Sequence, residues 1–423
     1  MAGRLELATT GLIDQWLTGE PSHSLFLSRF RRHTPFSIAS VETPFDGNPV
    51  DFGRTVSCRI PQNKGDLIRN MTVKVTLTDP SPDNFGKNDN YYPPSVCSHM
   101  VEYADLVIGN QVIQRLTGEF IYMYNQLWHN SDDVEQSIYF LNGHGNFLTY
   151  SDRTYTYYME LPFYFHRNSS LAIPSCALTK QLVEVRLTLR PFSEMLFMGG
   201  ALVAPDSTVA TGQIRNLSLD TEMVFLGAEE RAYVMTRPME YLITQLNVSQ
   251  FDLKDGETER SVLLKFQGPV REMFFVSQSE YAEQKNLPNN YNTIKRVELR
   301  FNNEVVFNRD TKYLTWGVPF RRHVNQPSDE TYVTTEVDDE DPSNVYGAGL
   351  FPHRVKSDFG MYSFARNPQS PEPSGHVNFS RIAHKMLTVE IVPRFAGYDN
   401  RVRVYATTQN ILVVAGGVAG LKF

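Results

Sequence analysis

Hydrophobic and polar residues alternate with a period of two along much of the chain. The segments 71–77, 183–189, 297–301 and 387–391 each place aliphatic or aromatic residues at every second position. This period puts one set of side chains on one face of a strand, as in an antiparallel sheet with one buried face. We therefore predict a β-strand in each segment.

Turn-forming pairs follow two of the apolar runs. Gly109-Asn110 comes after Leu106–Ile108, and Asn302-Asn303 comes after Leu299–Phe301. Glycine and asparagine tolerate the positive φ angles that two-residue hairpin turns require. Each pair predicts a tight β-hairpin.

Helical spacing is rare. An amphipathic helix of about three turns is predicted where apolar residues recur at helical intervals, at Phe120, Met123, Tyr124, Leu127 and Trp128. A second short helix is expected over 135–141. Neither supplies the crossover helices of an α/β sheet, so we assign the chain to the all-β class.

The two halves of the chain share weak sequence echoes. Three pairs of segments follow one another in the same order, namely 55–71 with 261–273, 105–112 with 298–305, and 165–185 with 364–391. The offset varies from 193 (Asn110 to Asn303) to 206 (Val56 to Val262), as loop insertions would make it vary. These echoes favour an internal duplication, with the boundary near residues 205–225, where Pro205–Gly212 resembles a linker.

Each repeat is expected to be a β-sandwich of the jelly-roll type. The segments Asp79–Ser98 and Asn325–Pro352 are too long for ordinary hairpin loops, which suits a jelly roll. The expected division is an N-terminal arm over 1–24, a first jelly roll over 25–212 and a second over 213–423.

Composition narrows the function classes. The 423 residues are 41% hydrophobic and 12% aromatic, which excludes a disordered chain. A net charge of −7 argues against a protein that coats nucleic acid. The chain has no run of 18 apolar residues. Its three cysteines, Cys58, Cys97 and Cys176, are too few for a disulfide framework, so we expect free thiols.

Catalytic and metal-binding signatures are missing from the sequence. It contains no nucleophile elbow, Walker loop or dinucleotide fingerprint. A metal-dependent enzyme of the cupin type would need a His-x-His pair, and the ten histidines form none. We therefore predict no catalytic residue, no metal ligand and no cofactor. Five Asn-x-Ser/Thr sequons, at Asn70, Asn168, Asn216, Asn247 and Asn378, are candidate glycosylation positions.

Five sequence blocks together resemble a known family. Their matching residues are Leu17, Thr18, Gly19, Pro21, Arg32, Thr34 and Phe36, then Phe52, Gly53 and Arg54, then Pro162, Phe163, Arg167 and Asn168, then Pro373, Ser374, Gly375, Asn378, Phe379, Ser380 and Arg381, and finally Gly417 and Gly420. In these blocks the chain is similar to the double jelly-roll major capsid proteins of nucleocytoplasmic large DNA viruses, of the iridovirus and phycodnavirus kind.

The resemblance implies a fold and a function. It implies two tandem eight-stranded antiparallel jelly rolls, with short helices in the loops, in a homotrimer of pseudo-hexagonal outline. Such trimers tile an icosahedral shell over an inner membrane and contact neighbouring capsomers and minor capsid proteins. The N-terminal arm would face the membrane side, and no direct contact with nucleic acid is expected. The protein would reside in the virion and be assembled in the host cytoplasm.

Two other functions stay open from the sequence. One is a minor capsid protein, or a receptor- or glycan-binding protein, with jelly-roll domains. The other is an assembly scaffold with the same double jelly-roll fold. If the chain is a capsid protein, we expect Arg381 to pair with a backbone carbonyl or a carboxylate at a junction of the jelly rolls.

Overall fold

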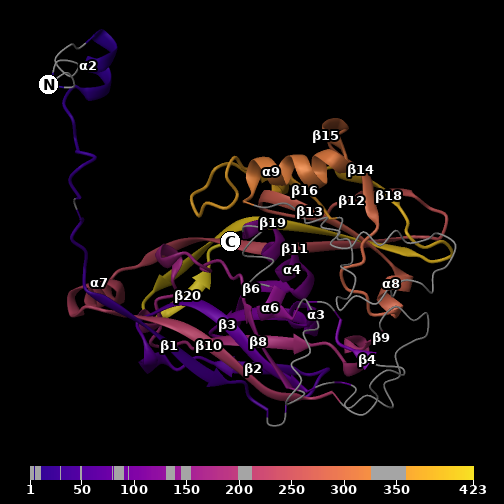
Figure 1. Ribbon diagram of the computed structural model, residues 1–423, viewed down its shortest axis with the longest axis horizontal. Helices are drawn as coiled ribbons and strands as arrows, with labels where there is room; N and C mark the ends of the chain where they lie inside the picture. The colour runs from indigo at the N-terminus through magenta and orange to yellow at the C-terminus, as the bar shows by residue number, and fades with distance from the viewer. Residues whose placement is uncertain are drawn as a thin grey trace. The chain divides into compact units, whose positions relative to one another are not determined.

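The computed structural model divides the chain into two units, Met1–Pro35 and Phe36–Phe423, which are described separately (Figure 1). The structure describes residues 4, 11–28, 30–47, 50–78, 80, 90–93, 95–129, 139–143, 154–198, 212–324 and 359–423. In the first unit, α2 (Leu12–Thr18) precedes a segment that lacks helix and strand among its described residues. The first unit ends at Pro35, and the arm expected over 1–24 stays a prediction.

Two antiparallel sheets form the first half of the second unit. One has the order β1-β10-β3-β7 and the other β2-β8-β5-β6. The strands are β1 (Phe36–Pro44), β2 (Thr55–Arg59), β3 (Leu67–Thr78), β5 (Val101–Ile108), β6 (Gln111–Thr117), β7 (Thr154–Glu160), β8 (Val183–Leu189) and β10 (Ile214–Leu226). A separate two-stranded sheet joins β4 (Asn90–Tyr91) to β9 (Phe197–Met198).

Two further antiparallel sheets form the second half. Their orders are β11-β19-β13-β16 and β12-β18-β14-β15. The strands are β11 (Met239–Leu253), β12 (Glu259–Leu263), β13 (Pro269–Ser279), β14 (Thr293–Phe301), β15 (Glu304–Asp310), β16 (Gly360–Ser363), β18 (Lys385–Val392) and β19 (Asn400–Ala415). Short strands β17 (Val377–Asn378) and β20 (Val418–Leu421) pair with β13 and β19.

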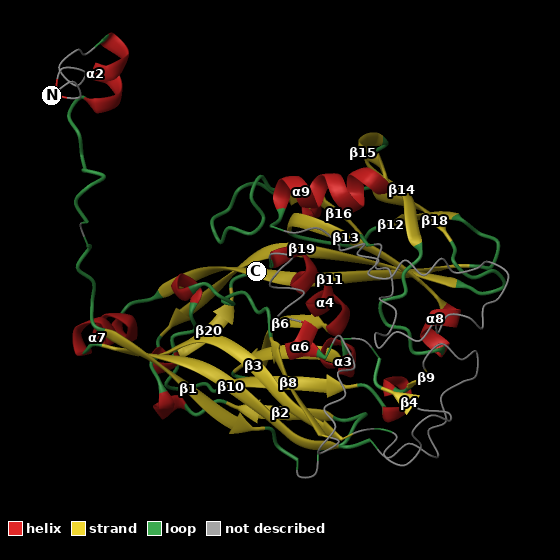
Figure 2. Cartoon of the chain, in the orientation of Figure 1, coloured by secondary structure: helices red, strands yellow, loops and turns green. Residues whose placement is uncertain are grey.

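Helices are short and lie between the strands (Figure 2). The α-helices are α3 (Val96–Met100), α4 (Gly118–Trp128), α6 (Tyr139–Asn142), α7 (Ala228–Thr236), α8 (Glu280–Gln284) and α9 (Val318–Arg322). Single turns of other helix types are η1 (Gln62–Lys64), η3 (Ser169–Leu171), η4 (Ser175–Ala177), η5 (Phe192–Met195), η6 (Tyr313–Gly317) and η8 (Phe379–Arg381). The helix predicted from the spacing between Phe120 and Trp128 is confirmed within α4. Residues 135–138 of the other predicted helix lie outside the described residues.

The two halves repeat one topology. When the eight long strands of each half are numbered in chain order, both halves pair them as 1-8-3-6 and 2-7-4-5. This is the pairing of a jelly roll, so the predicted fold of two tandem eight-stranded jelly rolls is confirmed. The echoed segments 105–112 and 298–305 form the equivalent hairpins, β5–β6 and β14–β15. The internal duplication is therefore visible in the strand order.

Strand β10 bears on the boundary between the jelly rolls. It follows the expected boundary between residues 212 and 213, yet it pairs with β1 and β3 of the first jelly roll. A cut at that point would remove the eighth strand and expose both neighbours. We therefore propose that the division lies after Leu226, in the segment that contains α7.

Both predicted hairpin turns are confirmed. Gly109 and Asn110 have φ angles of 57° and 67°, and Asn302 and Asn303 have 49° and 72°. Two successive positive φ angles are typical of the turn that matches the twist of paired strands. The four predicted strands are likewise confirmed within β3, β8, β14 and β18.

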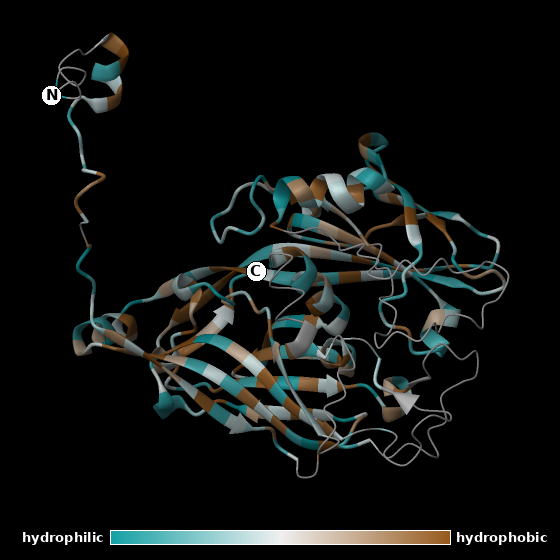
Figure 3. Cartoon of the chain, in the orientation of Figure 1, coloured by the Kyte–Doolittle hydropathy of each residue, from teal (hydrophilic) through white to brown (hydrophobic). Residues whose placement is uncertain are grey.

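Hydrophobic and hydrophilic positions alternate along the strands (Figure 3), and the buried apolar residues form a core in each jelly roll. Val73 and Val75 of β3 pack with Val185 and Leu187 of β8 in the first core. The second core contains buried residues from β13, β14, β18 and β19. Phe274, Val276 and Tyr405 come from strands of the second jelly roll but pack with the first core. The sheet that contains β13 and β19 is therefore buried on both faces.

Candidate functional site

The junction between the jelly rolls is built on the second face of that doubly buried sheet. Along β19, Val402 and Val404 point into the second core, while Arg403 and Tyr405 on the opposite face meet α4 of the first jelly roll. Helix α4 begins where the side chain of Thr117 accepts a hydrogen bond from the Phe120 N–H at 3.1 Å. This cap places Glu119 in the first turn, facing β19.

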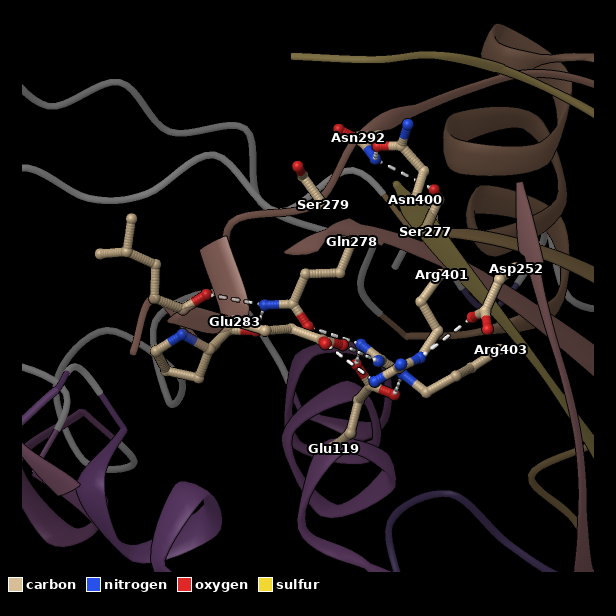
Figure 4. A network of polar contacts seen from close by, with 12 residues as sticks. Glu119, Asp252, Ser277, Gln278, Ser279, Glu283, Asn292, Asn400, Arg401 and Arg403 are labelled. Atoms are coloured by element: carbon tan, nitrogen blue, oxygen red, sulfur yellow. Dashed lines mark hydrogen bonds and ion pairs between the residues drawn. The ribbon is translucent and has the colours of Figure 1, made fainter. Parts of the chain in front are cut away.

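An ion-pair network occupies this junction (Figure 4). The Arg403 guanidinium donates to both carboxylate oxygens of Glu119, at 2.7 and 2.8 Å. It also donates to Glu283 at 3.0 Å and to the side chain of Gln278 at 2.6 Å. Arg401 donates to the other oxygen of Glu283 at 2.8 Å. The network thus ties α4 of the first jelly roll to β13, α8 and β19 of the second.

The Glu119–Arg403 pair is largely buried, with 13% and 15% of the two side chains exposed. Burial by itself raises the pKa of Glu119, but the charge of Arg403 and the hydrogen bonds from Arg403 and Tyr405 bring that pKa below its ordinary value. Glu119 is therefore ionised at neutral pH. Two-point contact between a guanidinium and a carboxylate fixes orientation as well as distance.

Aromatic contacts complete the junction. Trp128, at the end of α4, lies against Phe274 of β13 and against the ring of His323, whose centroid is 4.3 Å away. The ring of His323 in turn contacts the Glu272 carboxylate at 2.8 Å, and both side chains are fully buried. Neither this cluster nor the Glu119–Arg403 pair was predicted from the sequence. The alternating arginines of β19 are typical of a solvent-exposed strand face, and only the fold shows that they are covered.

The motif block around Pro162 and Phe163 forms a corner after β7. Phe163 is buried, and Arg167 has a left-handed φ of 55°. The N–H of Arg167 donates to Asn70 Oδ1 at 2.9 Å, and its guanidinium donates to Glu160 at 2.9 Å. Asn168 then caps η3 by accepting from the Ser170 N–H. These contacts give the block a structural role in the first jelly roll.

The motif block over 373–381 is the counterpart of that corner in the second jelly roll. Asn378 caps η8 by accepting from the Ser380 N–H at 3.0 Å, as Asn168 caps η3. Ser380 Oγ accepts from the Gly268 N–H at 2.7 Å, and Phe379 is fully buried. Asn378, rather than the echoed Asn367, is thus the structural equivalent of Asn168.

The beginning of the same block is a turn. The Ser374 hydroxyl donates to the carbonyl of Asn367 at 2.8 Å and accepts from its N–H at 3.0 Å. Gly375 has φ 131°, and a Cβ there would lie 2.9 Å from the carbonyl oxygen of Phe364. Pro373 is an exposed residue before this turn. The turn signal in the sequence therefore corresponds to a turn that requires glycine.

Arg381 has no partner among the residues that the structure describes. The side chain is exposed and forms no hydrogen bond or ion pair with any residue that the structure describes. The carbonyl of Phe379 accepts instead from Lys385 Nζ at 2.9 Å. The contact within the described part of the chain is thus made by Lys385, and the pairing expected of Arg381 stays a prediction.

The remaining blocks lie apart from these corners. Phe52 packs against Phe192, the Gly53 N–H donates to the Arg190 carbonyl at 2.9 Å, and the exposed Arg54 pairs with Asp51. The first block is divided between the two units. Its members up to Thr34 are exposed in the first unit and Phe36 begins β1 in the second, the full set being Leu17, Thr18, Gly19, Pro21, Arg32, Thr34 and Phe36.

The C-terminal glycines join the two jelly rolls. Gly417 lies in the turn between β19 and β20, and its carbonyl accepts from the Lys180 N–H at 3.1 Å. The Ala419 N–H donates to Gln181 Oε1 at 2.7 Å. Gly420 lies within β20, where a Cβ would approach Gln111 of the first jelly roll to 3.7 Å. This hairpin forms a second contact between the two jelly rolls, in addition to the ion-pair network.

The five sequons differ in how their asparagines are engaged. Asn168 and Asn378 cap helical turns, and Asn70 accepts from Arg167. Asn247 donates its amide to Thr408 Oγ1 at 2.9 Å, so its nitrogen is already occupied. Asn216 is exposed on β10. Glycosylation at these positions stays a prediction.

The part of the chain that the structure describes contains neither a metal-binding cluster nor a membrane-spanning helix. No group of three or more His, Cys, Asp and Glu residues there is placed to hold a metal ion. Among the described helices, none has the length and apolar character needed to cross a membrane. The three free cysteines are buried at Cys58 and Cys97 and half-buried at Cys176, and burial raises their thiol pKa values.

Known proteins resemble the chain over its whole length. A family model described as "Major capsid protein N-terminus" matches residues 24–227, a range that contains the complete first jelly roll. The major capsid protein of Pyramimonas orientalis virus is 27% identical over 431 residues, covering 100% of this chain and 99% of that protein. The major capsid protein of Paramecium bursaria Chlorella virus 1 is 26% identical over 455 residues and covers 100% of both.

A solved structure supports the fold. A model of the PBCV-1 virus capsid superposes with a TM-score of 0.73 at 20% sequence identity, over 95% of this chain and 100% of that one. The full-length matches to the two major capsid proteins confirm the resemblance stated from the sequence blocks, and this structure supports the fold alone.

Proposed function

We infer that the chain belongs to the double jelly-roll major capsid proteins of nucleocytoplasmic large DNA viruses and that it builds the icosahedral shell of such a virus. The observation that carries this inference is the repetition of one eight-stranded topology within a single chain, fastened by the buried junction. Relatives that are named major capsid proteins match the sequence of this chain from end to end.

The duplicated fold suits a pseudo-hexagonal building block. Three chains around a threefold axis present six similar jelly rolls, and a six-sided outline tiles a surface without gaps. A rigid junction between the two jelly rolls keeps the six at fixed angles. We therefore propose that the capsomer is a homotrimer that contacts neighbouring capsomers in the shell.

Finer partners belong to the same proposal. The first unit exposes large apolar residues, among them Trp16 at 91% and Phe26 at 95%. Such residues are usually covered by a partner in an assembled particle. We propose that this arm packs against minor capsid proteins or the membrane side of the shell. Assembly in the host cytoplasm and the lack of any enzymatic activity are further parts of the proposal.

Native mass spectrometry of the purified full-length protein tests the assembly state. Three chains of 48.3 kDa should give a species of about 145 kDa. A protein that stays monomeric at micromolar concentration and under shell-forming conditions would contradict the proposal. Purified virions provide the second readout, because a shell protein is abundant in them and an assembly scaffold is absent.

A further inference from the structure

The contact between the two jelly rolls of the chain joins two different parts of the fold. The first jelly roll contributes α4, the helix that follows strand β6, and the second contributes the outer face of β13 and β19. Because the two sides differ, each jelly roll uses one side of this contact and keeps the other side free. The second jelly roll retains its own counterpart of α4, and the first retains its own counterpart of the β13–β19 face.

The counterpart of α4 is the corner where β15 leads into η6 and α9. Asp310 Oδ1 accepts from the Tyr313 N–H at 3.1 Å, which repeats the cap that Thr117 makes at the start of α4. The hairpins before the two caps share one register and one bulge, at an offset of 193 residues (117 to 310). By the same offset (119 to 312), Lys312 occupies the position that Glu119 occupies in the first jelly roll.

A β-bulge defines the equivalence of the two sheet faces. It lies at Arg69 in β3 and at Arg271 in β13, where the pairing with the last strand of each jelly roll shifts by one residue. Three residues after the bulge, β3 pairs with Asp220 of β10 and β13 pairs with Tyr405 of β19. Asp220 is therefore the counterpart of Tyr405, whose hydroxyl donates to Glu119 within the chain.

The two free surfaces carry opposite charges at these equivalent positions. Lys312 is exposed and forms no ion pair with the described part of the chain. Asp220 accepts from the Ser40 hydroxyl and likewise has no cationic partner among the described residues. The neighbouring carboxylates of the same face, Glu42 and Glu222, are each paired within the chain. A cation and an anion that lack partners thus lie at the positions where the contact within the chain is made.

Burial distinguishes the two helical corners. Eight of the eleven residues of α4 are buried. The buried residues of α9 are Val318 and Pro319, whereas Phe320 is 80% exposed and the following Val324 is 54% exposed. Large apolar side chains that are exposed together are usually covered by a partner. The corner of the second jelly roll therefore lacks the cover that the second jelly roll gives to α4.

We propose that the β15–α9 corner of one copy docks on the outer face of β3 and β10 in the next copy, with Lys312 paired to Asp220. The contact within the chain is then repeated between chains. Head-to-tail contacts of this kind close into a ring when the rotation fits, and three chains supply six jelly rolls. The proposal rests on the homotrimer proposed above and names the surfaces that close it.

The reversed charges also set the order of the jelly rolls around the ring. Within the chain the acidic corner residue Glu119 meets Arg403, whereas between chains the basic Lys312 meets Asp220. A copy that presented its α4 to the first jelly roll of another copy would place Glu119 against Asp220. Like charges in contact weaken binding, so the charges favour alternation of first and second jelly rolls.

Native mass spectrometry of the full-length protein over a range of concentrations tests the contact. Lys312→Glu and Asp220→Lys each place like charges at every interface, so each should raise the concentration at which the trimer dissociates by about tenfold or more. The variant with both changes restores an opposite pair and should recover most of this loss. Lys265→Glu is the matched control, at an exposed lysine between β12 and β13, and should leave the trimer unchanged.

Cross-linking locates the contact. A carbodiimide joins a lysine amine to a carboxylate that touches it, so the covalently linked wild-type trimer should contain a peptide that joins Lys312 to Asp220. If Asp220→Lys does not fold, Asp220→Asn removes the charge at nearly the same size and should still weaken the trimer.

The outcomes separate this contact from the trimer itself. A wild-type protein that stays monomeric overturns both. A wild-type trimer that the charge reversals leave intact, or that the combined variant fails to restore, overturns the contact alone. A link from Lys312 to a different carboxylate of the neighbouring copy also overturns it.

Discussion

Arg403 lies between carboxylates from both jelly rolls, Glu119 on α4 and Glu283 on α8. Replacing it with methionine would leave Glu119 buried and unpaired. We expect Arg403→Met to lower the free energy of unfolding by about 3–5 kcal/mol, the usual cost of breaking a buried pair from one side. Denaturant unfolding of the purified variant measures this loss.

An exposed ion pair provides the control for Arg403. Lys254 contacts Asp399, and 74% of the lysine side chain is exposed. Solvent screens such a pair, so Lys254→Met should leave the unfolding midpoint nearly unchanged. If both substitutions lower the free energy of unfolding equally, the buried junction pair contributes no more to stability than the exposed pair.

His166 gives stability a defined pH dependence. Its pKa is lowered from 6.5 to about 3 in the folded protein by burial and by Arg167. Between these values the unfolded chain binds a proton that the folded one excludes, so stability falls as the pH drops below 6.5. The loss reaches about 2 kcal/mol by pH 5.

Substitution of His166 isolates this contribution. His166→Gln should flatten the curve of unfolding free energy against pH between 6.5 and 5, whatever its effect at pH 8. Denaturant unfolding at several pH values provides the curve. If His166→Gln keeps the full slope of unfolding free energy against pH over that range, groups other than His166 cause the loss of stability in acid.

At the scale of elements, the β19–β20 hairpin fastens the C-terminal end of the chain to the first jelly roll. Gly416 and Gly417 both have positive φ, 61° and 88°. A Cβ at Gly417 would lie 2.4 Å from Thr179 Oγ1, while at Gly416 it would meet nothing within 4 Å. Gly417→Ala should therefore destabilise the protein by about 1–3 kcal/mol more than Gly416→Ala, which bears only the conformational cost.

Thermal unfolding of both glycine variants measures the difference. Since the obstructing atom is the hydroxyl of Thr179, adding Thr179→Ala to Gly417→Ala should recover much of the difference. If Gly416→Ala and Gly417→Ala have the same melting temperature, the close contact between the hairpin and the first jelly roll does not contribute to stability.

The same scale shows why some elements were predictable and others were not. Strands such as β3 and β8 have one face in a core, and their alternation therefore appears in the sequence. The role of β10 was missed because its partner β1 lies about 180 residues earlier, and no local pattern encodes that pairing. The burial of Arg403 on β19 could not be predicted, because a polar strand face that is covered and one that is exposed to solvent show the same alternation in the sequence.

The motif residues show a similar division. Turn and cap positions such as Gly375 and Asn378 have local chemistry that explains them. The buried partners of the junction, Glu119 and Arg403, come from segments 284 residues apart in the chain. Only the duplicated fold brings them together, so the junction could not be expected from the sequence.

At the scale of the whole molecule, folding and shell assembly should be separable at the boundary between the two units. The unit Phe36–Phe423 contains both jelly rolls, both cores and the junction. The described residues of Met1–Pro35 add no buried side chain to either core. Deletion of residues 1–35 should therefore leave the melting temperature within a few degrees of that of the full chain, and should leave the proposed trimer intact.

The same deletion should impair the assembly of the proposed trimers into closed shells. Large exposed apolar residues in the arm, such as Trp16 and Leu17, have no role in the fold of the second unit, so their burial is expected in the shell. Electron microscopy of particles from cells that express the truncated protein should show fewer closed shells, and Trp16→Ser with Leu17→Ser should give the same defect without a deletion. A large drop in melting temperature on truncation would instead make the arm part of the folded subunit, and normal shells from both variants would remove it from assembly.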